Sequence, residues 1–157
     1  MVELTIEGID QILTSVQERL KRLRNLRPVW RSIVTYLRQA TTDQFSSAGG
    51  RSRDKWEPLS TAYAVRKAQV WPGKPILRAS DRLFQSLTGQ NQDSIVEIDA
   101  RSLTWGTATP YARFHQRGTA RMPQRKILVV TKADRRQITA LVRAHLANQA
   151  RVSGYGL

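Results

Sequence analysis

Between residues 95 and 107 the chain reads Ile95-Val96-Glu97-Ile98-Asp99-Ala100-Arg101-Ser102-Leu103-Thr104-Trp105-Gly106-Thr107. Two short groups of apolar and β-branched residues flank the polar group at 99–102, a pattern that is typical of two strands joined by a turn. Most apolar residues before this stretch recur at helical spacing instead. The change of period therefore predicts a strand pair within a mainly helical chain.

Helical spacing dominates the sequence before these strands. A short strand or extended arm at 3–7 comes first, because Leu4 and Ile6 alternate with polar residues. Gly89 stands just past the last of the helices expected here, as is common at a helix end. The expected helices cover residues 9–24, 28–46, 60–69 and 79–88.

After the two strands, a short helical piece is expected at 110–116, ended by Gly118. The apolar run at 127–130 reads as a buried strand, and a final helix begins at Thr131 or Ala133. Helices, then strands, then a closing helix indicate an α+β fold. We expect a three- or four-stranded, mostly antiparallel sheet packed with the N-terminal helices and the C-terminal helix. The open edges of such a small sheet favour an oligomer.

The domain organisation is expected to be simple, because 157 residues fit one domain. We assign residues 1–148 to a single α+β domain and residues 149–157 to a flexible C-terminal tail. Within the domain, the basic segment Ser46–Arg53 is rich in Gly and Ser, which predicts a mobile loop near 46–55.

The composition points to an acidic partner. The chain holds 26 Lys and Arg against 12 Asp and Glu, a formal charge of +14, which suits nucleic acid, an anionic membrane or an acidic protein ring. It has no Cys, which excludes disulfides and thiolate metal sites and suits assembly in a reducing cytoplasm. No apolar run approaches the ~20 residues that span a bilayer, and the acidic first residues indicate no signal peptide.

No catalytic or metal-binding constellation is evident. His115 and His145 lie 30 positions apart without a carboxylate at metal spacing, so the sequence indicates no metal site and no cofactor. Glu97 and Asp99 lie on the same face of the expected strand. They could form a paired acid site, but the favoured alternative is that they lie on the solvent-exposed face of an edge strand. Ser80 and Ser86 lack a histidine and an acid at a recognisable spacing for a triad. The sequence therefore predicts that the protein is not an enzyme.

Two tryptophans stand in loop-like sequence, Trp56 and Trp71. Aromatic residues in loops are either anchors for a neighbouring subunit or fold back over the core of their own chain. The sequence leaves both alternatives open for each residue.

Basic residues carry the other partner signal. Residues 108–157 hold ten Lys and Arg and one acid, Asp134, and residues 19–38 hold seven Lys and Arg and no acid. A high density of basic residues, together with aromatic residues in loops, is compatible with nucleic-acid binding. No zinc finger, RNA-binding signature or clear helix-turn-helix is present in the sequence, however. The alternative is a solvated face that meets acidic proteins.

Four spaced motifs between residues 56 and 128 resemble the phage virion morphogenesis family, the Mu-type tail completion proteins, and the likeness covers roughly residues 40–148. The first three comprise Trp56, Pro58 and Leu59; then Leu77, Ser80, Leu83, Ser86 and Leu87; then Tyr111, Ala112, His115, Gln116 and Gly118. The fourth is Pro123-Gln124-Arg125-Lys126-Ile127-Leu128, which lacks the second proline, the phenylalanine and the glycine usual in the family.

This resemblance implies a structural virion protein of the neck that completes the tail and joins it to the head. It implies self-association in a ring, for which a hexamer is one candidate, and contacts with adjacent neck, tail-tube or tail-terminator proteins. Assembly in the host cytoplasm, non-specific contact with DNA in the channel and no membrane contact complete this expectation. The alternative is a basic protein that binds nucleic acid through sequence-independent phosphate contacts. The candidate interface residues are Trp56, Trp71, Arg51, Arg53, Arg121, Arg125 and Lys126.

Overall fold

The structure is a computed structural model that describes residues 25–152. The arm expected at 3–7, the helix expected at 9–24 and residues 153–157 of the expected tail lie outside the described residues.

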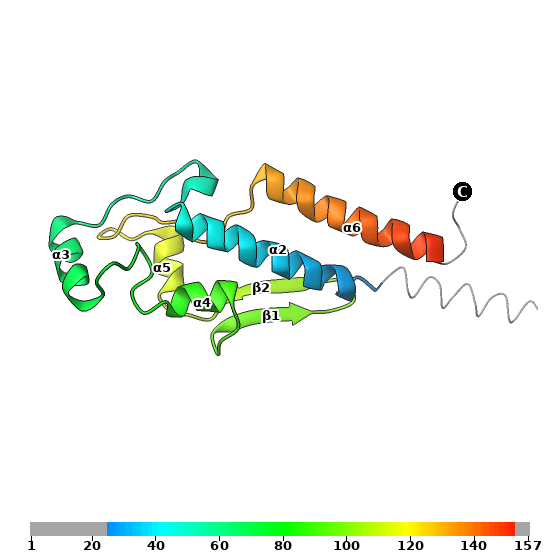
Figure 1. Cartoon of the computed structure of the whole chain (residues 1–157), viewed down its shortest axis with the longest axis horizontal. Helices are drawn as coiled ribbons and strands as arrows, with labels where there is room; N and C mark the ends of the chain where they lie inside the picture. Colours follow the sequence, from blue (N-terminus) through cyan, green and yellow to red (C-terminus); the bar gives the residue numbers. More distant parts are fainter. Residues whose placement is uncertain (1–24, 153–157) are drawn as a thin grey trace, which may run out of the picture.

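A long helix, α2 (Arg27–Ser46), forms the central element of the fold (Figure 1). Pro28 lies in its first turn, where the missing N–H costs no helical hydrogen bond, as the sequence predicts. Its buried residues recur at spacings of three and four and so form one face. They are Val29, Ile33, Val34, Ala40, Thr41, Gln44 and Phe45.

Two layers cover α2. Helix α6 (Lys132–Val152) runs along one side, and α4 (Arg82–Thr88) lies on the other side with the hairpin of β1 (Ser94–Ile98) and β2 (Leu103–Thr107) (Figure 1). The strands are antiparallel, with Val96 opposite Trp105. Ser86 ties α4 to β2 through a 2.6 Å hydrogen bond to the hydroxyl of Thr107. The predicted strand pair and the α+β fold class are confirmed.

The expectation of a three- or four-stranded sheet is wrong for the described residues, which contain two strands. The run at 127–130 forms no strand, and side chains instead satisfy backbone groups of residues 126–128. Gln116 Oε1 accepts hydrogen bonds from the N–H groups of Ile127 and Leu128, at 2.8 and 3.0 Å, and Gln116 Nε2 donates to the Leu128 carbonyl. Gln44 Nε2 donates to the Lys126 carbonyl at 2.8 Å.

The hydrophobic core gathers residues from four segments that are distant in sequence. Its buried members are Phe45, Trp56, Leu83, Leu87 and Ile127. The ring of Phe45 meets that of Trp56 edge to face, with centroids 5.3 Å apart. The core thus joins the end of α2, α4, the 127–130 segment and the loop that carries Trp56.

The start of α6 is fixed by a reciprocal cap. Thr131 Oγ1 accepts from the Asp134 N–H at 3.1 Å, and Asp134 Oδ2 accepts from the Thr131 N–H at 2.7 Å, which is a capping box. The helix continues to Val152, so residues 149–152 of the expected tail are helical, and whether they are flexible stays a prediction. Ala, Gln and Arg in this stretch favour helix, and no Gly or Pro occurs between Lys132 and Ser153.

Three short helices complete the fold: η1 (Gly50–Ser52), α3 (Thr61–Val70) and α5 (Ala112–Arg117). Gly118 ends α5 with φ +73°, and a Cβ there would lie 2.9 Å from the Gln124 nitrogen. In the segment at 46–55, the Gly49 N–H donates to the Gln44 carbonyl and the Trp56 N–H donates to the Ala48 carbonyl. Whether this segment is mobile in solution stays a prediction.

Candidate interface groove

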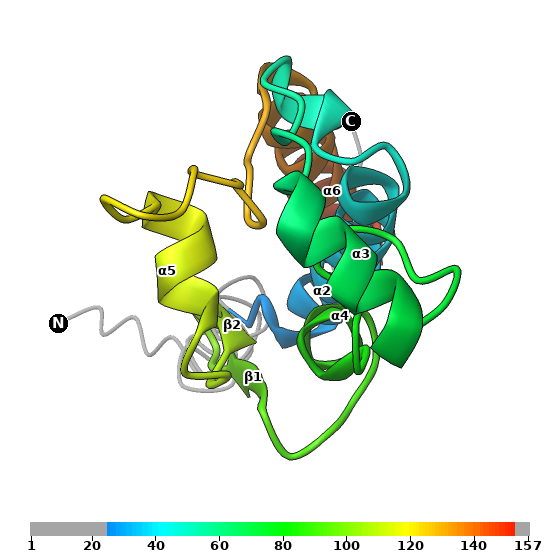
Figure 2. The same cartoon turned by 90° about the vertical axis from the view of Figure 1, so that its left-hand side faces the viewer.

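A groove of about 860 Å³ opens at the end of the molecule where α3 lies. One wall is α3 and the chain that leads into it, and the other is α5 with the loop at 119–125 (Figure 2). The start of α4, from Asp81 to Leu83, also lines it. We call this feature the α3–α5 groove.

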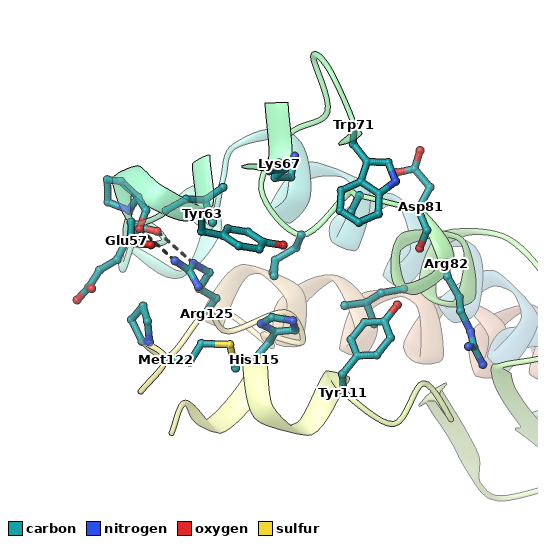
Figure 3. A pocket seen from close by; sticks show the side chains of 18 of the residues that line it. Glu57, Tyr63, Lys67, Trp71, Asp81, Arg82, Tyr111, His115, Met122 and Arg125 are labelled. Atoms are coloured by element: carbon teal, nitrogen blue, oxygen red, sulfur yellow. Dashed lines mark hydrogen bonds between the residues drawn. The ribbon is translucent and has the colours of Figure 1, made fainter. Parts of the chain in front are cut away.

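Aromatic and apolar side chains give the groove its surface. Tyr63, Trp71 and Tyr111 line it while keeping 44%, 36% and 38% of their surface exposed, and Met122 lies beside His115 (Figure 3). Large exposed aromatics that share one concavity are typical of protein contact sites, because they bury much area at low conformational cost. The groove is therefore suited to holding a peptide segment or a neighbouring protein.

Helix α3 stands out from the body of the protein. Nine of its ten residues are exposed, including Val65 and Val70, and Lys67 is its buried residue. An amphipathic helix in a folded domain ordinarily buries an apolar face. The exposed apolar surface of α3 is consistent with a helix that is covered by a neighbour.

Two buried cations lie in the groove walls. The Lys67 ammonium donates a hydrogen bond to the Lys74 carbonyl, and Arg125 donates to the carbonyls of Glu57 and Pro58 at 3.1 Å each. Each residue is only 5% exposed, and no carboxylate within residues 25–152 forms an ion pair with either. Burial lowers the pKa of Arg125 from its ordinary value. Buried charges are ordinarily paired, so these two cations make the groove suited to an anionic group.

His115 projects into the same groove from α5. Burial, and secondarily the charge of Arg125, lowers the pKa of its imidazole below the ordinary 6.5, so the ring is neutral at neutral pH. Its Nδ1 is buried and has no hydrogen-bond partner in the described structure. Its backbone carbonyl accepts from the Arg125 N–H at 2.8 Å, which joins α5 to the 119–125 loop.

The acid at the start of α4 is already neutralised. Asp81 Oδ1 accepts from Arg78 at 2.7 Å and Oδ2 accepts from Lys74 at 2.5 Å. The hydrogen bond from Arg78 is the main cause that lowers the pKa of Asp81. Arg82 is likewise paired with Asp93, at 2.5 and 2.8 Å.

Of the two tryptophans in loop-like sequence, the structure places one on the surface and one in the core. Trp71 lines the α3–α5 groove and is exposed. Trp56 is 5% exposed, and its Nε1 donates to the Lys126 carbonyl at 3.0 Å. Its indole packs in the core, as the second of the two alternatives has it, and any contact of Trp56 with a neighbour stays a prediction.

The five candidate arginines and lysines divide in a similar way. Arg121 is exposed at the groove, whereas Arg125 is buried in its wall. Arg51 donates to Asp134 at 2.5 Å, and Lys126 pairs with Asp54 at 3.0 Å. Arg53 is exposed in the loop after η1, with φ +62°. Arg121 and Arg125 therefore lie at the groove, while Arg51, Arg53 and Lys126 lie outside its lining.

The groove also collects residues that the sequence singled out only as parts of motifs. Each of the four spaced motifs contributes to its lining. These lining residues are Pro58, Leu59, Leu77, Ser80, Leu83, Tyr111, His115, Pro123 and Arg125. Sequence reasoning missed the site roles of Lys67, Tyr63 and Tyr111. The available signal was the set of spaced motifs. It was used only for the family resemblance and did not show that the fold brings the motif residues together.

The outer face of α6 is a second charged surface. Arg135, Arg136 and Arg143 surround a shallow depression with Thr139 and Ala140. All three arginines are exposed, and none pairs with an acid in the described part of the chain. This face is suited to phosphate oxygens or to an acidic protein surface.

Residues 25–152 contain no cluster of three or more His, Asp or Glu side chains that could hold a metal ion. Glu97 and Asp99, a possible acid pair, are both exposed. No helix among these residues is long and apolar enough to cross a membrane.

Comparison with known proteins gives the family that the chain matches. A family model described as the phage virion morphogenesis family matches residues 4–147. A curated relative, Mu-like prophage FluMu G protein 1 of Haemophilus influenzae, is 29% identical over 139 residues, which cover 85% of this chain and 90% of the relative. No solved structure matches the chain significantly.

Proposed function

Because the chain belongs to the phage virion morphogenesis family and has a structural role in a phage virion, we propose that it completes the tail and joins it to the head in the neck. In this proposal the protein is a subunit of an oligomeric ring and not an enzyme. A hexamer is one candidate stoichiometry.

The observation that carries this proposal is the convergence of the four motifs on one groove. Sixty-eight positions separate Glu57 from Arg125 in the sequence, yet Arg125 donates to the Glu57 carbonyl in the groove wall. The groove has the exposed aromatics of a contact site and lacks the paired acids or nucleophile–base pairs of an active site. A groove whose side chains suit contact rather than catalysis fits a subunit that holds its neighbours.

The partners that suit this role are other copies of the chain and the adjacent neck, tail-tube or tail-terminator proteins. The formal charge of +14 favours neighbours with acidic faces. We propose assembly in the host cytoplasm and a final location at the head-proximal end of the tail.

Deleting the gene from the phage or inducible prophage tests the role. We expect lysates with filled heads and separate tails, and restored joining when the gene is supplied on a plasmid. Electron microscopy of the lysates distinguishes the outcomes. Joined, infectious particles from the deletion strain would contradict the proposal, and an absence of any tails would place the protein earlier in assembly.

A second candidate function is sequence-independent binding of nucleic acid, favoured by the arginine face of α6. Arg135, Arg136 and Arg143 are exposed together and are free of acidic partners within residues 25–152. Within a neck, such a face would contact DNA phosphates in the channel. Tight binding to DNA by the purified protein, combined with normal head–tail joining in the deletion strain, would favour this alternative.

A further inference from the structure

We propose that the α3–α5 groove binds the acidic N-terminal segment, residues 1–10, of a neighbouring copy of this chain. This inference rests on the proposed ring, because each subunit would hold the next one through this arm.

The distribution of charge along the chain is the first argument. Residues 1–18 contain four acids and no Lys or Arg. The rest of the chain therefore holds all 26 basic residues and the other eight acids. A segment of one sign on a body of the opposite sign favours self-association, because the segment of one copy is attracted to the body of the next.

The composition of the arm is the second argument. Residues 2–7 read Val-Glu-Leu-Thr-Ile-Glu, so apolar and polar residues alternate. In an extended conformation, Glu3 and Glu7 point to one side and Leu4 and Ile6 to the other. Such a segment offers carboxylates to cations and aliphatic side chains to aromatic rings at the same time.

The groove offers both counterparts. Lys67 uses one of its three donors and Arg125 two of its five, in each case toward backbone carbonyls. Arg121 adds an exposed cation, and Tyr63, Trp71 and Tyr111 supply apolar surface. Of the two acids in the lining, Asp81 is held by Lys74 and Arg78, and Glu57 is exposed. A carboxylate entering the groove would therefore compensate charges that the described chain leaves unpaired.

The position of the first described residues is compatible with the arm of a second copy, and the mixing experiment below separates this case from an arm that folds back on its own chain. The Leu26 N–H donates to the Ala100 carbonyl at 2.8 Å, at the turn of the hairpin. The groove lies beyond the other end of α2, about 30 Å away at the helical rise for its 20 residues (Figure 1). A contact between opposite ends of two copies is heterologous, which is the kind of contact that builds a ring when the rotation between copies closes.

The binding step is tested with a labelled peptide of residues 1–10 and the full chain carrying Glu3→Lys and Glu7→Lys, whose own arm no longer competes. Fluorescence anisotropy should show saturable binding. Affinity should fall roughly tenfold or more when Lys67→Met and Arg121→Gln are added, which remove the groove charges without attracting the basic arm, and a peptide with Lys at positions 3 and 7 should bind as weakly. Equal binding of both peptides, or no binding of either, would overturn the inference.

Mixing two charge-reversed proteins tests whether the arm reaches another copy. One protein carries Glu3→Lys and Glu7→Lys, and the other carries Lys67→Glu and Arg121→Glu. Each alone should be mainly monomeric by light scattering, because its arm and groove have charges of the same sign. The mixture should assemble, because each arm then meets a groove of opposite charge. Assembly that is unchanged in the separate proteins, or peptide binding without assembly of the mixture, would overturn docking between copies.

The folded state of the variants is checked by thermal melting. If Lys67→Glu melts well below the wild type, Lys67→Met with Arg121→Gln replaces it and should still weaken peptide binding.

Failure of the arm contact is distinguishable from failure of the proposed function. Normal head–tail joining by the arm and groove variants would overturn the arm contact and leave the neck role standing.

Discussion

Gln116 and Leu128 are joined by two hydrogen bonds that copy the pairing of β-strands. The Gln116 Nε2 donates to the Leu128 carbonyl at 2.9 Å, and Oε1 accepts from the Leu128 N–H at 3.0 Å. Oε1 also accepts from the Ile127 N–H at 2.8 Å. One side-chain amide thus replaces the neighbouring strand that the 127–130 segment lacks, and it holds Ile127 in the core.

The substitution Gln116→Ala should therefore destabilise the protein by about 2–4 kcal/mol, because it leaves part-buried backbone groups at two residues without partners. Urea unfolding followed by circular dichroism measures this loss. Gln137→Ala is the matched control, since Gln137 is exposed on α6 and should change stability by less than about 0.5 kcal/mol. Similar stabilities of the two variants would show that water replaces the amide of Gln116.

The same segment shows how far the sequence could predict this structure. Helix α2, the hairpin and α6 follow from periodicity and from Pro28, and all three were predicted. The run at 127–130 was predicted as a strand because its apolar residues have the composition of one. Local pattern cannot reveal that a distant glutamine satisfies its backbone, since the contact depends on tertiary structure.

The site was less accessible to sequence reasoning than the fold. Lysines and arginines are mostly exposed in proteins, so Lys67 and Arg125 were not expected to be buried. Trp71 was recognised as a candidate contact residue, and the structure places it in the groove. The motifs indicated that their residues belong together, but their meeting in a single groove could be seen only in three dimensions.

Asp134 connects α2, η1 and the start of α6. Its side chain is 1% exposed and accepts from Tyr36 at 2.6 Å, from Arg51 at 2.5 Å and from Thr131 at 2.7 Å. Asp134→Asn should lower the free energy of unfolding by about 2–3 kcal/mol, because hydrogen bonds to a charged group contribute more to stability than hydrogen bonds between neutral groups. Unfolding in urea at pH 7 measures the loss. A variant as stable as the wild type would show that the charge of Asp134 contributes nothing to this junction.

The contribution of Asp134 should also depend on pH. Burial raises the pKa of its carboxyl, but the hydrogen bonds from Tyr36, Thr131 and Arg51 outweigh burial and hold the pKa below the ordinary 3.8. A lowered folded-state pKa gives stability that is fully present above the unfolded value and is lost as pH falls through the folded value. The difference in unfolding free energy between wild type and Asp134→Asn should therefore be constant from pH 7 to 5 and shrink below about pH 4. A difference that grows on acidification would contradict this assignment.

Trp56→Ala should reduce the free energy of unfolding by about 3–5 kcal/mol, because the indole fills the core against Phe45. Gly49→Ala should also destabilise, since a Cβ at Gly49 would lie 2.6 Å from Trp56 Cδ1 and the backbone has φ +91°. Thermal melting of both variants measures these effects. A Trp56→Ala protein that melts normally but is absent from virions would restore the interface assignment.

The arginine face of α6 should give any DNA binding a strong salt dependence. Replacing Arg135, Arg136 and Arg143 with Ala should flatten the slope of log affinity against log salt by about three units, because each phosphate contact contributes about 0.9. Filter binding with two duplexes of scrambled sequence measures the slope and should show no preference between them. A preference for one duplex at physiological salt would promote the nucleic-acid function over the structural one.

Trp71→Ala should impair assembly without impairing folding. Trp71 lines the α3–α5 groove with 36% of its surface exposed, so truncating it removes little buried core but a large part of the contact surface. Removing a central aromatic from an interface commonly costs about 2 kcal/mol or more of binding free energy, which corresponds to roughly a thirtyfold loss of affinity.

Complementation of the deletion strain, followed by counting joined particles, measures the effect of Trp71→Ala on assembly, and thermal melting measures its effect on folding. Val130→Ala is the control, because Val130 is 54% exposed and lies outside the groove lining. We expect the Trp71 variant to melt normally and join few particles, and the Val130 variant to behave as wild type in both respects. Equal joining by the two variants would remove Trp71, and with it this wall of the groove, from the assembly contact.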